Sequence, residues 1–196
     1  MIESKSDHDI EDSSSKQFLR SNLTKKITTA SIFIALGLII AIPNPFIYIQ
    51  FIGAKIYPFA HLINAITGIL IGMLFSLITG LGIAILRFSL ALGSLFAFPG
   101  HLTGAFVVSL TAHYLEKKYP HKIDLAALSE PIGTVFLGAT IAYLIAPLIG
   151  FTPDWNIIFL LGYWSSWTLS SIPGSIMGYI ILKILRKAGI SREDFN

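Results

Sequence analysis

Cysteine is absent from the 196-residue chain, and charged residues are scarce. Without cysteine, the chain has no disulfides and no thiolate metal ligands. Asp, Glu, Lys and Arg make up 13% of the residues, about half the fraction of an average soluble domain. The chain also lacks the phosphate-loop pattern G-x-x-x-x-G-K-[ST] and the hydrolase patterns H-E-x-x-H and G-x-S-x-G. We therefore expect no enzyme, no metal site, no cofactor and no nucleic-acid partner.

Hydrophobic residues are abundant instead. They form 54% of the chain, and the mean hydropathy is +0.72. They gather in uncharged runs that approach the length of about 20 residues that a membrane-spanning helix needs. The sequence predicts an all-α membrane protein with six transmembrane helices, and a break at Gly72 divides its longest run into two. The expected helices cover residues 26–43, 56–72, 72–92, 95–115, 129–149 and 155–182.

The chain is expected to have three parts. Residues 1–24 are acidic and rich in serine, which predicts a disordered cytosolic tail and not a signal peptide. Residues 25–188 form the six-helix transmembrane domain, and residues 189–196 form a second short cytosolic tail. All Lys and Arg residues except Lys55 and Arg87 fall within residues 5–26, 117–122 or 183–192. The positive-inside rule then places both termini in the cytosol and the protein in the cell membrane.

Polar side chains are costly inside a bilayer, so those at membrane depth are candidates for a functional site. Counting from Pro58 at about 1.5 Å per residue places His61 and Asn64 about 5 and 9 Å below the outer boundary. The same count places Arg87 about 8 Å below it, and His101 begins the fourth helix on that side. Each histidine or asparagine alone is equally compatible with a structural role in the core. Together they predict a polar cluster in the outer half of the membrane.

Aromatic residues on the last helix predict one wall of the same site. Tyr163, Trp164 and Trp167 are spaced by three and four residues, so they share one side of a helix. Such a wall can hold a small flat ring by stacking, with polar groups fixing its orientation. Glu130 is interpreted differently, as an acid at the start of the fifth helix near the cytosol.

Several strings in the chain resemble the ThiW-type S component, the small substrate-capturing membrane subunit of energy-coupling factor (ECF) transporters. The resemblance spans roughly residues 25–185. It is carried by Gly53-Ala54-Lys55, His61-Leu62-Ile63-Asn64, Arg87, Gly93-Ser94-Leu95-Phe96-Ala97-Phe98-Pro99-Gly100 and Glu130-Pro131-Ile132-Gly133-Thr134.

The resemblance implies a six-helix S-component bundle that binds hydroxyethylthiazole or a related thiamine precursor for ATP-driven vitamin uptake. It implies a lid after the first helix, in or near which Lys55 would lie. The implied partners are a membrane coupling subunit and two cytosolic ATPases. The first helix would dock on the coupling subunit through small residues such as Ser31 and Ala35. The substrate contacts would come from His61, Asn64, Arg87, His101, Tyr163, Trp164, Trp167 and Lys55.

Other functions remain open at this stage. The nearest alternative is an S component for another small heterocyclic vitamin. A stand-alone secondary transporter would be favoured by internal repeats or charge pairs at mid-membrane, and no clear repeat relates residues 26–92 to 95–182. A membrane enzyme would require a turnover that depends on a defined His or Glu. A scaffold without a ligand would have a closed bundle with no pocket.

Overall fold

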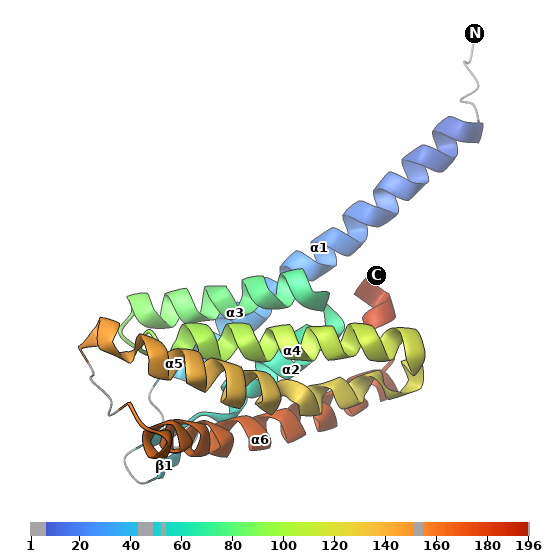
Figure 1. The fold of residues 1–196 in the computed structure, drawn as a ribbon. Coiled ribbons are helices and arrows are strands. Elements are labelled where there is room, and N and C mark those ends of the chain that lie inside the picture. The colour runs from blue at the N-terminus through green and yellow to red at the C-terminus, as the bar shows by residue number, and fades with distance from the viewer. Residues whose placement is uncertain (1–6, 43–48, 52–53, 151–154, 196) are drawn as a thin grey trace.

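The computed structural model describes residues 7–42, 49–51, 54–150 and 155–195. In this part of the chain, long helices pack side by side and a short hairpin lies at one end (Figure 1). The prediction of an all-α membrane bundle is confirmed. The α-helices are α1 (Asp7–Ala41), α2 (Pro58–Leu70), α3 (Gly72–Ser89), α4 (Ala97–Lys118), α5 (Ala139–Ile145) and α6 (Ile157–Lys187).

Shorter elements connect these helices. The antiparallel strands β1 (Ile49–Phe51) and β2 (Ala54–Ile56) form the hairpin, in which Lys55 pairs with Gln50. Between α4 and α5 the chain forms the 3-10 helix η1 (Pro120–Ser129) and the π-helix η2 (Ile132–Gly138). The 3-10 helices η3 (Ala146–Ile149) and η4 (Arg192–Phe195) follow α5 and α6.

Among the described residues, four helical stretches are long and apolar enough to cross a membrane. They are Leu19–Ala41, Gly72–Ser89, Pro120–Leu148 and Ile157–Lys187, and the shorter apolar helix Pro58–Leu70 accompanies them. The structure thus supports a membrane protein, and the number of six spans stays a prediction.

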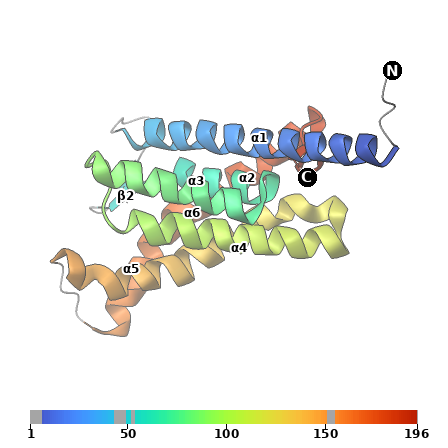
Figure 2. The ribbon, with the colours of Figure 1, turned by 90° about the horizontal axis from the view of Figure 1, so that it is seen from above.

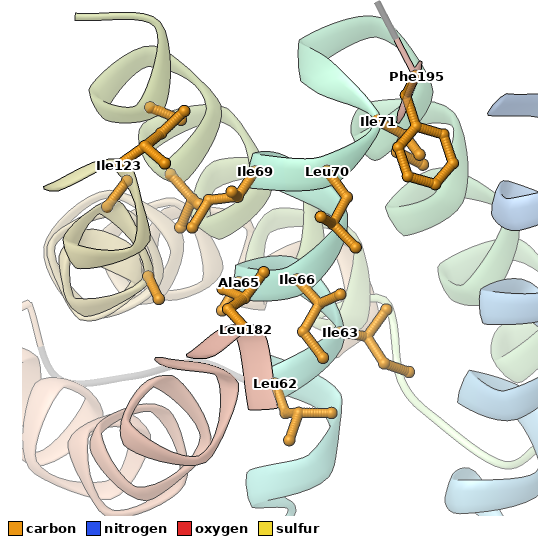
Figure 3. Packing of buried hydrophobic residues seen from close by; sticks show 14 of the residues in the cluster. Leu62, Ile63, Ala65, Ile66, Ile69, Leu70, Ile71, Ile123, Leu182 and Phe195 are labelled. Atoms are coloured by element: carbon orange, nitrogen blue, oxygen red, sulfur yellow. The ribbon is translucent and has the colours of Figure 1, made fainter. Parts of the chain in front are cut away.

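Helix α2 lies at the centre of the bundle and packs against α1, α3, α4 and α6. Its residues from Leu62 to Leu70 are all buried, because neighbouring helices surround α2. Figure 3 shows Ala65 and Ile69 of α2 pointing toward Leu182 of α6 and Ile123 of η1. This core fixes the helix that carries two of the predicted site residues.

The predicted break at Gly72 is confirmed. Helix α2 ends at Leu70, and α3 begins at Gly72, whose φ of +79° is left-handed. Glycine adopts this conformation without the steric cost of a Cβ atom. At the same break, Arg192 Nη1 donates a hydrogen bond of 2.8 Å to the carbonyl oxygen of Ile69. Phe195 is buried beside Ile71 (Figure 3).

Two segments differ from the expectation. Helix α1 begins at Asp7, inside the part predicted to be a disordered tail, because each further residue adds a hydrogen bond to a helix already nucleated in the bundle. The segment expected to be a polar loop at 117–128 is largely the helix η1. Ile123, Ala126 and Ala127 of η1 are buried. The chain therefore enters the bundle before residue 129, where the pattern of charged residues predicts the fifth helix to begin.

The described ends of the chain lie at one end of the bundle, and the hairpin lies at the other (Figures 1 and 2). Lys25 Nζ of α1 donates to the carbonyl oxygen of Asp194 at 3.1 Å, which ties the two terminal segments together. We call the opposite end, which carries β1 and β2, the hairpin end.

Candidate functional site

A cavity of about 350 Å³ opens at the hairpin end. Its size is within the range of about 300–1,000 Å³ that small-molecule sites occupy. Side chains from α2, α3, α4 and α6 surround it, together with Tyr57 at the end of the hairpin. The principal lining residues are Tyr57, His61, Arg87, Phe96, His101 and Trp167.

The sequence-predicted residues divide into those that line the cavity and those that do not. His61, Arg87, His101 and Trp167 line it. Asn64 is 1% exposed and lies behind the wall, where it contacts His101. The expected cluster of polar groups from three helices is therefore present, with Asn64 and His101 as its buried members.

The other two aromatic residues predicted for the site, Tyr163 and Trp164, lie outside this lining. Trp164 turns toward α5 and donates from Nε1 to Thr140 Oγ1 at 3.0 Å. Tyr163 packs edge-on against Phe96 and Tyr143, with ring centroids 6.0 and 5.7 Å away. Lys55 belongs to β2, two residues before the cavity-lining Tyr57, and its side chain lies outside the described residues.

Glu130 is the centre of the buried polar network, although the sequence suggested only a helix-start acid. Its side chain is completely buried, and Oε1 lies 3.0 Å from His61 Nδ1 and 3.1 Å from Asn64 Nδ2. The hydroxyl of Thr134 also donates to Oε1, and the hydroxyl of Ser171 donates to Oε2. Three donors, the amide of Asn64 and the hydroxyls of Thr134 and Ser171, match an ionised carboxylate, which only accepts hydrogen bonds. The interpretation as a terminal acid was wrong because η1 carries the chain deep into the bundle before Glu130.

The network has a defined hydrogen-bond direction. Asn64 Nδ2 faces two acceptors, Glu130 Oε1 and the carbonyl oxygen of Gly100 at 3.4 Å, so Oδ1 faces His101. An amide oxygen only accepts, so His101 Nδ1 donates to it at 3.1 Å. His101 Nε2 is then the acceptor for Arg87 Nη1 at 3.3 Å. The chain of bonds runs from the Arg87 guanidinium through His101 and Asn64 to the Glu130 carboxylate.

Arg87 brings a positive charge to the cavity without a direct carboxylate partner among the described residues. Its Cζ lies 5.4 Å from the ring centroid of Tyr57, a cation–π arrangement. Nε is buried and has no hydrogen-bond partner in the described part of the chain. The guanidinium therefore has a donor that no described residue uses, and the Arg87 side chain lines the cavity.

Gly104 makes room for the network where α4 crosses η2. A Cβ atom at this position would lie 2.8 Å from Asn64 Nδ2 and closer still to Glu130 Oε1 and Thr134 Oγ1. All three atoms belong to buried, hydrogen-bonded groups, so they cannot move away without breaking their bonds.

We predict that Gly104→Ala lowers the unfolding free energy by about 1–3 kcal/mol, the usual cost of overpacking a well-packed interior. The matched control is Gly162→Ala on α6, whose Cβ would meet nothing within 4 Å. That control should be neutral or stabilising, because alanine favours helix by about 1 kcal/mol over glycine. Thermal unfolding of the two purified variants in detergent measures the difference. Equal melting temperatures would contradict the close packing around Glu130.

The comparisons with known proteins give one match. The family described as "Thiamine-precursor transporter protein (ThiW)" matches residues 27–188. No curated protein and no solved structure matches the chain. The matched range includes every cavity-lining residue named above and the whole Glu130 network.

Proposed function

The chain belongs to the ThiW family of thiamine-precursor transporters, and from this we propose that it is the substrate-capture subunit of an ECF-type vitamin transporter. Its substrate is a thiamine precursor of the hydroxyethylthiazole kind. The family resemblance drawn from the sequence strings is thereby confirmed, and the transporter family agrees with the absence of enzyme patterns.

The observation that carries the proposal is the cavity at the hairpin end. It combines an aromatic face, Trp167 and Phe96, with the polar groups His61 and Arg87. This combination suits a small aromatic heterocycle, which stacks on the rings and is oriented by a few polar contacts. The hairpin leads directly into the cavity, since the Tyr57 backbone N–H donates to Ser170 Oγ of α6 at 3.1 Å. The hairpin is thus suited to act as the lid, with Lys55 in it.

The same proposal assigns the energy source to other chains. Both termini lie in the cytosol, and a coupling subunit with two ATPases binds the chain from the membrane and the cytosol. Helix α1 offers the docking face, because its small residues Ser31 and Ala35 are both exposed and lie four residues apart. Close approach of a partner helix at these positions needs the absence of large side chains.

Co-expression with a coupling subunit and two ATPases tests the proposal. Uptake of labelled hydroxyethylthiazole should require all of these chains and active ATPases. Ser31→Trp with Ala35→Trp should abolish co-purification and uptake while leaving thiazole binding to the isolated chain unchanged. The control Ile141→Trp, at an exposed position of α5, should retain both activities. Uptake by this chain alone would instead establish the stand-alone transporter.

A further inference from the structure

The cavity presents two recognition groups whose hydrogen-bond roles are opposite. On one side, Arg87 carries N–H groups, which donate only. On the other side, His61 uses Nδ1 against Glu130 Oε1 at 3.0 Å, and the imidazole lines the cavity. The nitrogen left for a ligand is therefore Nε2. Whether this nitrogen donates or accepts depends on the protonation of His61.

The carboxylate settles the role of Nδ1. Glu130 already accepts hydrogen bonds from Asn64, Thr134 and Ser171, so these three neighbours act as donors and the carboxyl group needs no proton of its own. An ionised carboxylate accepts only, so His61 Nδ1 carries a proton and donates. If the imidazole is neutral, Nε2 carries no proton and accepts.

Charge balance favours the neutral imidazole. Within the described residues around the cavity, the network holds one guanidinium, Arg87, and one carboxylate, Glu130. His101 is neutral, because its Nε2 accepts from Arg87. With His61 neutral, the buried cluster has no net charge. A proton on His61 Nε2 would add an uncompensated positive charge at membrane depth, which is costly.

We infer that Glu130 acts as a positioning residue, holding His61 in the Nδ1–H tautomer so that the cavity selects a neutral ring compound bearing a hydroxyl group. The hydroxyl donates to His61 Nε2, and an acceptor elsewhere on the ligand receives a hydrogen bond from Arg87. This inference rests on the proposed function for the identity of the ring, but the assigned tautomer is a property of the ligand-free protein. An anionic ligand is disfavoured at this position, because a carboxylate has no proton to donate to the unprotonated Nε2 of His61.

The discriminating ligands are 4-methyl-5-(2-hydroxyethyl)thiazole, its 2-chloroethyl analogue and the corresponding thiazole acetic acid. Chlorine fills the space of the hydroxyl but cannot donate, which leaves a buried acceptor unpaired. We expect the chloroethyl compound to bind about 10- to 100-fold more weakly than the hydroxyethyl compound to the wild-type chain. The acid should bind more weakly than the alcohol as well. Equal affinities, or tighter binding of the acid, would overturn the inference.

Two variants locate the effect. In His61→Phe the preference for hydroxyl over chlorine should disappear, because the ring remains and the acceptor is gone. In Glu130→Gln the preference should persist, because the amide oxygen can occupy the Oε1 position while its N–H donates to the Ser171 hydroxyl. A hydroxyl preference that survives in His61→Phe would assign the acceptor to another residue and overturn the inference.

Nitrogen-15 NMR of histidine-labelled protein gives a test that needs no ligand. The signals of His61, assigned by their loss in His61→Phe, should show a protonated Nδ1 and an unprotonated Nε2. If no thiazole binds but this tautomer is found, the proposed substrate fails and the polarity of the cavity stands. A protonated Nε2 overturns the inference even if the thiazole binds.

Discussion

Glu130→Ala should lower the unfolding free energy by about 3–5 kcal/mol, because it removes the negatively charged partner from a buried, hydrogen-bonded charge network. The substitution leaves donors of His61, Asn64, Thr134 and Ser171 without their acceptor. It also removes the only carboxylate that balances Arg87 in the described surroundings of the cavity. Thermal or SDS-induced unfolding of the purified protein measures the loss.

Two controls make this prediction specific. Glu130→Gln keeps an acceptor at Oε1 but not the negative charge, so it should lose less stability than Glu130→Ala. Glu193→Ala removes an exposed acid near the C-terminus and should change the unfolding free energy by less than about 0.5 kcal/mol. An alanine variant as stable as the wild-type chain would show that the carboxyl group does not organise the bundle.

Arg87→Met should weaken thiazole binding by about 10- to 150-fold, the value of one or two hydrogen bonds from a charged donor. Methionine retains the apolar part of the side chain but has no N–H groups, so the ligand loses its donor in the cavity. The measurement is calorimetric titration of monodisperse protein. The matched control is Lys183→Met, which removes a cation near the end of α6 that carries the C-terminal segment, and it should leave the affinity unchanged. Unchanged affinity in Arg87→Met would exclude the guanidinium from ligand recognition.

Much of the fold is predictable from the uncharged runs in the sequence and the residues that interrupt them. The break at Gly72 is visible because an uncharged run too long for one span contains a glycine. The meeting of His61, Arg87 and His101 is also predictable, because the helix rise places all three at one depth. That the three side chains also lie next to one another in the membrane plane depends on how α3 and α4 pack around α2. The residue pattern of a single helix does not predict this packing.

The sequence does not predict the role of Glu130, because the charged residues of the preceding segment place this residue near the cytosolic boundary of the membrane. Ala126 and Ala127 of η1 are the sequence feature that indicates burial, because two small apolar residues shortly before Glu130 allow this part of the chain to pack inside the bundle. Trp164 illustrates a second limit. It shares one side of α6 with Trp167, but η2 and α5 pack against that helix. Trp164 contacts these two elements instead of the cavity: its ring centroid lies 5.1 Å from that of Phe136, and its Nε1 donates to Thr140.

Thermal unfolding of the wild-type chain with hydroxyethylthiazole, thiamine and the pyrimidine precursor tests the proposed capture role most directly. A ligand that binds only the folded state, at a hundredfold excess over its dissociation constant, raises the free energy of unfolding by about 2.7 kcal/mol. We predict that the thiazole raises the melting temperature, that the other two compounds do not, and that Trp167→Ala abolishes the rise. A melting temperature that does not respond to the thiazole, or that responds only to one of the other compounds, would contradict a thiazole-binding cavity at the hairpin end.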